Sequence, residues 1–176
     1  LLTRTREQLV QERTSIKNMI RMRAHQFGLL SPEARREMGQ SLLKAILAKT
    51  PSSEFTTIIH AYEKIWQTLD TEIKAIEAQL KQQAQQDPLE STYRSAPGIG
   101  PLSARILSYE LGDIRQFANE RQLFSYTGLT PSEHSSGDAI RRGHITRQGN
   151  TRVRHILCES AWVAIRKDQD LRRFYE

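Results

Sequence analysis

Two adjacent serines, Ser135 and Ser136, stand before a glycine and a strongly basic segment. A serine hydroxyl is a weak nucleophile, so it needs activation and a partner for the charge that develops during reaction. Arginine can be that partner, because its guanidinium binds phosphate oxygens through two parallel hydrogen bonds. The basic side chains are Arg141, Arg142, Arg147, Arg152 and Arg154, with only Asp138 against them. The residues alone leave two interpretations open: a nucleophile beside an anion-binding surface, or turn-forming serines before a solvated basic loop.

The stretch "PGIGP" at 97–101 predicts a helix-hairpin-helix. Gly98 and Gly100 permit tight backbone geometry, Ile99 anchors the turn in the core, and Ala104 allows close helix packing. The freed backbone N–H groups and the N-terminus of the next helix can then face a phosphate, whatever the base sequence. The same turn would also serve a plain packing unit of two helices, so both interpretations stay open.

Other titratable residues offer weaker chemistry. His134 and His144 flank the basic loop, where a proton-transfer role is conceivable. His155 and Cys158 have an H-x-x-C spacing. A structural zinc site requires a second pair of ligands, and no such pair follows. A buried cysteine beside a solvated histidine is the commoner arrangement. The acidic residues are scattered, so the sequence predicts neither a metal site nor a cofactor in this chain.

The first half of the chain, 1–88, predicts a coiled-coil arm that carries no reactive cluster. A long amphipathic helix over 3–27 ends at a glycine, and a shorter helix capped by Ser31 lies in a tip at 28–54. A third helix over 53–86 has apolar residues at alternating spacings of three and four, which is typical of a coiled-coil seam. They are Ile59, Tyr62, Trp66, Leu69, Ile73, Ile76 and Leu80. The first helix could pair with this seam in an antiparallel sense, or a second chain could pair with it in a homodimer.

The second half, 89–176, predicts a small helical domain that positions the chemistry-bearing residues. Its helices are expected at 89–96, 101–111, 119–126 and 150–167. A short β-hairpin is expected around "AIRRGHIT", inside an otherwise loop-like segment. The fold class is therefore mainly α: a long-helix arm, then a small domain with a helix-hairpin-helix and a β-hairpin.

Caps and core residues complete this expectation. Asn119 is the predicted N-cap of the helix at 119–126, and Gly128 is its predicted C-cap. Asn150 is the predicted cap of the last helix, whose N-terminus adds positive potential to the basic segment. Gly143 and Gly149 would let the backbone approach DNA closely. The predicted core residues around the short helix at 119–126 are Phe117, Leu123, Phe124 and Tyr126.

Composition narrows the functional classes. The chain has 176 residues, 38% of them hydrophobic, with a formal charge of +6 and a pI near 9.7. Such a basic chain suggests a nucleic acid or another anionic surface as partner. No apolar run approaches the length of a membrane span, and the single cysteine suits a reducing, cytoplasmic setting. The abrupt start inside a helical pattern suggests a fragment of a longer protein.

Several motifs in one order resemble a known family. "PGIGP", "GD" with "RQL", "GLTP", "SG", "GHITRQGN" and "RVR" follow each other between residues 96 and 157. Together they resemble the C-terminal domain of DEDD-type insertion-sequence transposases, which are bridge-RNA-guided recombinases related to pilin-gene invertases. The segment "TREQLVQERTSIKNMIRMRAHQFGL" is similar to the segment that leads into the coiled coil in this family. The resemblance therefore covers nearly the whole chain.

The resemblance implies a function for each part. The family's serine that attacks the DNA phosphodiester matches Ser136, with Ser135 as the alternative, and the arginines, Asn150 and the hairpin turn would hold DNA or guide RNA. The coiled coil would mediate dimerisation, and synapsis would use a tetramer. Mg²⁺ would bind a RuvC-like domain with four acidic residues, which this chain lacks. We therefore expect a bacterial, cytoplasmic transposase fragment that binds nucleic acid but does not recombine it alone.

One alternative belongs to a different functional class. A non-catalytic helix-hairpin-helix scaffold on a coiled-coil dimerisation arm would account for the same charges and helices. Such a scaffold would not require a Ser-Gly pair followed by a basic Gly-Asn-x-Arg segment. That pattern is what favours the transposase interpretation.

Overall fold

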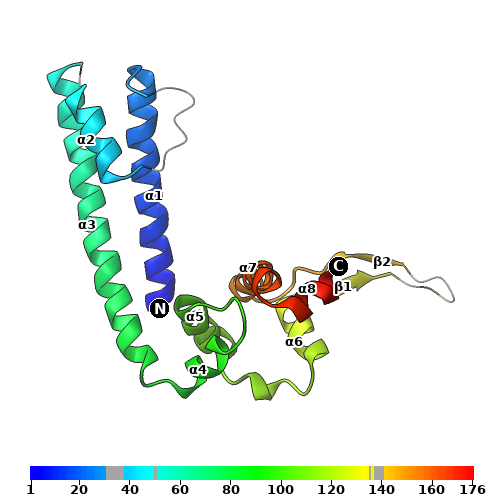
Figure 1. Ribbon diagram of the computed structural model, residues 1–176. Coiled ribbons are helices and arrows are strands. Elements are labelled where there is room, and N and C mark those ends of the chain that lie inside the picture. Colours follow the sequence, from blue (N-terminus) through cyan, green and yellow to red (C-terminus); the bar gives the residue numbers. More distant parts are fainter. Residues whose placement is uncertain (31–37, 50, 135, 137–140) are drawn as a thin grey trace. The chain divides into compact units, whose positions relative to one another are not determined.

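The computed structural model describes residues 1–30, 38–49, 51–134, 136 and 141–176 (Figure 1). Within these ranges the chain is mainly α-helical, with one small antiparallel pair of strands, as the sequence predicts. The chain divides into two compact units, Leu1–Gln82 and Gln83–Glu176. No helix in the described ranges has the length and apolar character needed to cross a membrane.

Unit 1 contains three helices, α1 (Leu2–Gln26), α2 (Gln40–Ala48) and α3 (Ser53–Ala84). The end of α1 is followed by Gly28 with φ +66°, a backbone conformation that favours glycine. The short helix α2 begins at Gln40, later in the chain than the predicted start after Ser31. Its predicted cap Ser31 lies outside the described residues.

The two long helices of unit 1 run antiparallel. Arg6 Nη2 lies 2.7 Å from Glu77 Oε1, and Arg13 Nη1 lies 2.9 Å from Asp70 Oδ1. Positions rise along α1 as they fall along α3, which only an antiparallel pair allows. Of the two partners left open for the apolar seam, the structure therefore provides the first helix of the same chain.

The apolar seam of α3 faces the interior of unit 1. Ile59, Trp66, Ile73 and Leu80 are buried, and the intervening seam residues are half-buried. The N-terminal half of the seam belongs to a core that joins all three helices. It contains Ile20, Ala24, Leu30, Met38, Leu43, Ile46, Phe55, Ile59 and Trp66.

Unit 2 consists of short elements. They are α4 (Pro88–Arg94), α5 (Pro101–Leu111), the 3-10 helix η1 (Ile114–Gln116), α6 (Glu120–Thr127), β1 (Pro131–Glu133), β2 (Arg142–Ile145), α7 (Thr151–Lys167) and α8 (Gln169–Tyr175). The predicted caps form: the Asn119 side chain accepts from Gln122 N–H, and Asn150 accepts from the N–H groups of Arg152 and Val153. The helix α8 was not predicted from the sequence, although Asp168 caps it in the same way.

The core of unit 2 joins α4, α5 and α7. Its buried side chains are Tyr93, Ala104, Ile106, Leu107, Leu111, Val153 and Ile156. Two of the four predicted core residues near α6, Phe117 and Leu123, pack against it. The prediction was wrong for Phe124 and Tyr126, whose exposed fractions are 45% and 46%. The helix α6 has only eight residues and turns one face inward, so residues on its other face stay in solvent.

The predicted β-hairpin forms, and its first strand lies upstream of "AIRRGHIT". The strand β2 within "AIRRGHIT" pairs with β1, upstream of that segment, with Pro131 opposite Ile145 and Glu133 opposite Arg142. The register shifts between these two pairs. The N–H of His134 donates to the carbonyl of Arg141 at 2.9 Å and extends the ladder toward the hairpin tip.

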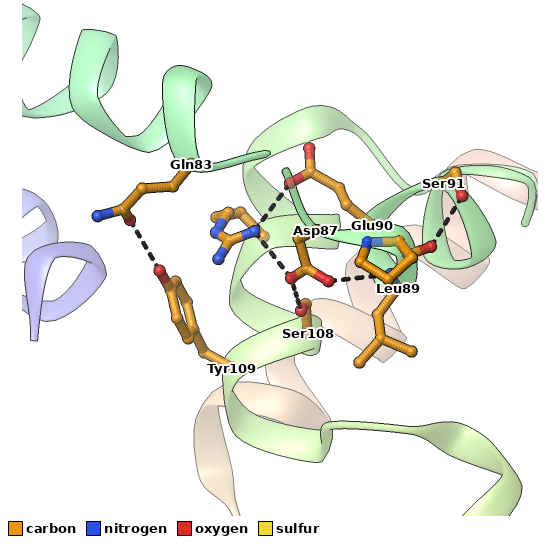
Figure 2. Close-up of polar contacts among 9 residues, drawn as sticks. Gln83, Asp87, Leu89, Glu90, Ser91, Ser108 and Tyr109 are labelled. Carbon is orange, nitrogen blue, oxygen red and sulfur yellow. Dashed lines mark hydrogen bonds and ion pairs between the residues drawn. The ribbon is translucent and has the colours of Figure 1, made fainter. Parts of the chain in front are cut away.

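A buried ion network holds α4 against α5 (Figure 2). The Arg105 guanidinium, with 6% of its side chain exposed, donates through Nη1 to Asp87 Oδ2 at 2.9 Å and to Glu90 Oε2 at 3.3 Å. The Ser108 hydroxyl donates to the same Asp87 oxygen, while Asp87 Oδ1 accepts from Leu89 N–H and caps α4. The Ser108 hydrogen bond is the main cause that lowers the pKa of the Asp87 carboxyl.

Two adjacent isoleucines on α3 test the packing of unit 1. Ile59 is fully buried, whereas 44% of its neighbour Ile58 is exposed. We expect Ile59→Ala to lower the free energy of unfolding by about 2–5 kcal/mol, because it removes buried methyl groups and leaves a cavity. The matched variant Ile58→Ala is expected to cost less than about 1 kcal/mol. Chemical denaturation followed by circular dichroism measures both; equal losses would contradict the packing described.

Candidate nucleic-acid interface

The turn between α4 and α5 is built around Gly98. It has φ +86°, and a Cβ placed on it would collide with the backbone carbonyl of Ser160 and lie 3.2 Å from the backbone nitrogen of Ala164. Ile99 packs against the core of unit 2, and Ala104 is fully buried, as expected. A Cβ on Gly100 would meet nothing within 4 Å, so the start of α5 is open at that position. Gly98 therefore serves packing on α7, while Gly100 leaves room beside the helix N-terminus.

Two further glycines close the base of the β-hairpin. A Cβ on Gly128 would collide with the backbone of Gln148, and a Cβ on Gly149 would collide with the carbonyl of Tyr126. The N–H of Arg147 donates to the Gly128 carbonyl at 3.1 Å across the same crossing. The chain's own backbone thus fills the space next to Gly149 that the sequence analysis assigned to DNA.

Gly143 in β2 has a similar internal neighbour. A Cβ at this position would collide with the hydroxyl of Ser132, which donates to the carbonyl of His144 at 3.1 Å. Both glycines that were expected to admit DNA are therefore explained by close contacts inside unit 2.

Glu110 joins α5 to the start of α7. Its Oε2 accepts from Asn150 Nδ2 at 2.8 Å, and its Oε1 lies 2.5 Å from Arg152 Nη1. The exposed fractions of the Glu110 and Arg152 side chains are 13% and 19%, so water screens this ion pair only partly. Because Asn150 also caps α7, one carboxylate on α5 fixes both the cap residue and the first turn of α7.

The five candidate arginines fall into two groups. Arg152 pairs with Glu110, and Arg154, which is half-buried, donates through Nη1 to the Thr127 carbonyl at 2.8 Å. The side chains of Arg141, Arg142 and Arg147 are exposed. Arg147 also has φ +55°, an unusual backbone conformation for a residue with a side chain.

The candidate nucleophile lies on the β-hairpin beyond β1. Ser136 is exposed, and Arg141 and Arg142 are exposed on the returning side of the same hairpin. His134 and His144 are exposed there as well. The alternative nucleophile Ser135 lies outside the described residues, as does Asp138. The described hairpin therefore brings a hydroxyl, guanidinium groups and imidazoles onto one exposed element.

The residues that the structure describes do not form a metal site. Among them, no three His, Cys, Asp or Glu side chains gather as ligands, so they do not fit a bound Mg²⁺. His155 and Cys158 are both exposed on α7. The expectation of a buried cysteine was wrong, because position 158 lies on the solvent face of the helix, between the buried Ile156 and Ser160.

Comparison with known proteins identifies the family. Residues 91–176 match the family model described as "Transposase IS116/IS110/IS902 family". The chain is 31% identical over 166 residues to a "Probable family 20 transposase" of Pseudomonas aeruginosa, across 93% of this chain and 49% of that protein. It is also 31% identical over 172 residues to the "Transposase for insertion sequence element IS1111A" of Coxiella burnetii, across 94% of this chain and 46% of that protein. The chain belongs to this transposase family.

The chain covers only part of the length of its relatives. It spans about half the length of the curated relatives it matches. A third relative, a "Putative transposase y4pF/y4sB" of Sinorhizobium fredii, is 30% identical over 162 residues, with 92% of this chain and 42% of that protein covered. Because these matches cover 92–94% of this chain, the similarity to transposases extends over the long helices of unit 1 as well as over unit 2.

Sequence reasoning about this transposase chain missed two organising residues, Glu110 and Arg105. Their partners lie 40 and 42 positions away for Glu110, and 15 and 18 positions away for Arg105. Neither stands in a motif with a fixed spacing. One weak signal was available for Arg105, since it lies between the apolar residues Ala104 and Ile106 in a short helix.

The two glycines of the turn offer a matched test. We expect Gly98→Ala to lower the free energy of unfolding by about 2–3 kcal/mol, because alanine disfavours its positive φ and its Cβ meets the α7 backbone. Gly100→Ala is expected to cost less than about 1 kcal/mol, since the added methyl group enters open space. Urea denaturation of the two variants measures the difference. Similar stabilities would show that Gly98 does not set the contact with α7.

Proposed function

We propose that this chain is the C-terminal part of a DNA transposase, in which unit 2 binds DNA and supplies Ser136 as the nucleophile for strand cleavage. The match of residues 91–176 to the transposase family carries the proposal. The exposed hairpin with Ser136, Arg141 and Arg142 supports the choice of site. The resemblance of its Ser-Gly pair to the family's reactive serine supports the choice of nucleophile.

In the proposed reaction, Ser136 Oγ attacks a backbone phosphorus and forms a phosphoserine ester. The bond from phosphorus to one deoxyribose oxygen breaks, that oxygen takes a proton from solvent, and the serine proton passes to solvent. The exposed arginines hold the phosphate oxygens as negative charge develops on them. The described residues do not fit a metal, so no step here runs through Mg²⁺. As the resemblance implies, we propose that this ion binds a RuvC-like domain of the longer protein.

The internal partners of Arg152 and Arg154 refine the proposed interface. Because these two guanidinium groups already bind a carboxylate and a backbone carbonyl, we assign direct phosphate contact to the exposed Arg141, Arg142 and Arg147. Gly100 and the adjoining start of α5 are assigned a second, sequence-independent backbone contact. Arg152 and Asn150 shape the site from within unit 2.

The resemblance extends the proposal to further partners of the whole protein. A guide RNA is the proposed second nucleic acid, held by the same basic surface and by the arm. The proposed assembly is a dimer through the arms and a tetramer in the synaptic complex. The chain alone is expected to bind nucleic acid without recombining it.

Salt-dependent binding tests the interface. We expect this chain to bind duplex DNA and structured RNA at low salt, with an affinity that falls steeply as the salt concentration rises, because the counterions released on binding then gain less entropy. Replacing Arg141, Arg142 and Arg147 with glutamine should reduce the slope of log K against log salt by about 2–3, or roughly 0.9 per lost phosphate contact. The control Arg115→Gln, on the 3-10 helix, should leave the slope unchanged. Absence of binding at low salt would refute the proposed interface.

Strand cleavage by the full-length transposase tests the nucleophile. Ser136→Ala should abolish both cleavage and the covalent protein–DNA adduct seen on denaturing gels, with DNA affinity retained, because only the attacking oxygen is lost. Ser125→Ala, which removes an exposed hydroxyl on α6, is the matched control and should cleave normally. Normal cleavage by Ser136→Ala would remove this residue from the mechanism. If Ser135→Ala then also cleaves, the non-catalytic scaffold is the better interpretation of unit 2.

A further inference from the structure

Two contacts hold α5 and α7 together at opposite ends. Gly98, just before α5, meets the backbone of Ser160 and Ala164 in the second half of α7. Glu110, near the end of α5, meets Asn150 and Arg152 at the start of α7. The two helices therefore run antiparallel, and the stretch of α7 from Arg152 to Ser160 is about 12 Å long at 1.5 Å per residue. This length separates the α4–α5 turn from the base of the β-hairpin.

The hairpin joins α7 through a short connection. After β2 ends at Ile145, residues 146–149 cross the end of α6 at the Gly128 and Gly149 contacts, and Asn150 then caps α7. The crossing is held by backbone contacts, among them the hydrogen bond from the N–H of Arg147 to the Gly128 carbonyl at 3.1 Å. Glu110 binds Asn150, the residue that follows the crossing directly, so loss of the Glu110 contacts removes the side-chain hydrogen bond that ties the end of this connection to α5.

We propose that Glu110 is a positioning residue of the strand-cleavage site. By holding Asn150 and Arg152, it fixes the hairpin that carries Ser136 relative to the phosphate-binding turn at Gly100. The inference rests on the proposed function for the identity of the reacting group. It adds that a carboxylate, unable to contact a DNA phosphate favourably, sets the geometry of the site from α5.

The same geometry assigns Arg152 a role different from that of the exposed arginines. Its guanidinium lies 2.5 Å from Glu110, and only 19% of its side chain is exposed. A phosphate that bound Arg152 would have to replace a carboxylate already in place. Arg152 acts instead as the ionic partner through which Glu110 holds the first turn of α7.

A distance measurement in this chain tests the positioning. Spin labels at His144→Cys on the hairpin and Glu159→Cys on α7, in a Cys158→Ser background, report the distribution of distances between the two elements. Glu110→Ala should broaden that distribution clearly, and Glu110→Gln should broaden it less, because the amide oxygen still accepts from Asn150. The control Ile106→Val removes a buried methyl group from the same helix without touching either partner, and should leave the width unchanged. Equal widths in Glu110→Ala and the parent would overturn the proposal.

Cleavage by the full-length transposase separates this inference from the proposed function. At saturating DNA, Glu110→Ala should slow single-turnover cleavage by about 10- to 100-fold while DNA affinity changes less than about threefold, because orientation and not binding is lost. Cleavage by Ser136→Ala at the parent rate refutes the proposed function. Full cleavage by Glu110→Ala beside an inactive Ser136→Ala refutes only the positioning role.

The salt dependence of DNA binding tests the role given to Arg152. Arg142→Gln should reduce the salt slope by about one phosphate contact, whereas Arg152→Gln should leave the slope unchanged and broaden the spin-label distances as Glu110→Ala does. A reduced slope in Arg152→Gln with unchanged distances would show that this guanidinium faces DNA, and would overturn the proposal.

Discussion

The arrangement of unit 2 depends on one charge buried between α4 and α5. An arginine with so little exposure is tolerable only where carboxylates and hydrogen-bond acceptors surround it, because an unpaired buried charge costs several kcal/mol. Asp87 and Glu90 meet the Arg105 guanidinium, and Tyr109, whose ring lies 4.1 Å from that guanidinium, donates through its hydroxyl to Gln83 Oε1 at 2.7 Å (Figure 2). The network therefore determines where α4 begins and which face of α5 it covers. The α4–α5 turn follows from that placement, since the two helices must be joined over residues 95–100.

Close backbone contacts then build the rest of unit 2 on α7. At Gly98, Gly128 and Gly149 a single added carbon would meet main-chain atoms, which cannot move aside as a flexible side chain can. Each of the three has a positive φ, so glycine satisfies a steric and a conformational requirement at once. The family's glycine-containing motifs are thereby explained in large part by packing. Within them, an added Cβ would meet nothing within 4 Å at Gly100 and at Gly112, and of these Gly100 lies at the N-terminus of a helix.

How far the sequence predicted this structure depends on how local each signal is. Caps at Asn119, Gly128 and Asn150 were predicted because a cap involves only the next two or three residues. The seam of α3 was predicted because seven apolar residues repeat at a fixed spacing. The Arg105 network and the Glu110 cluster were missed because each joins positions at least 15 residues apart in the chain. Phe124 and Tyr126 were misplaced because hydrophobicity alone does not tell which face of a short helix is covered.

The same distinction divides the basic segment. Five arginines lie close together between positions 141 and 154, and their charge alone suggests a single surface with a single function. Burial separates them: Arg152 and Arg154, at the start of α7, are half-buried and bind acceptors of unit 2, whereas Arg141, Arg142 and Arg147, on and just after the hairpin, are exposed. The helix N-terminus itself favours anions, yet here Glu110 already occupies the side of that terminus marked by Asn150 and Arg152. Positive charge in unit 2 therefore lies in two physical settings: the half-buried guanidinium groups hold the scaffold together, and the exposed ones reach solvent, where a phosphate has access to them.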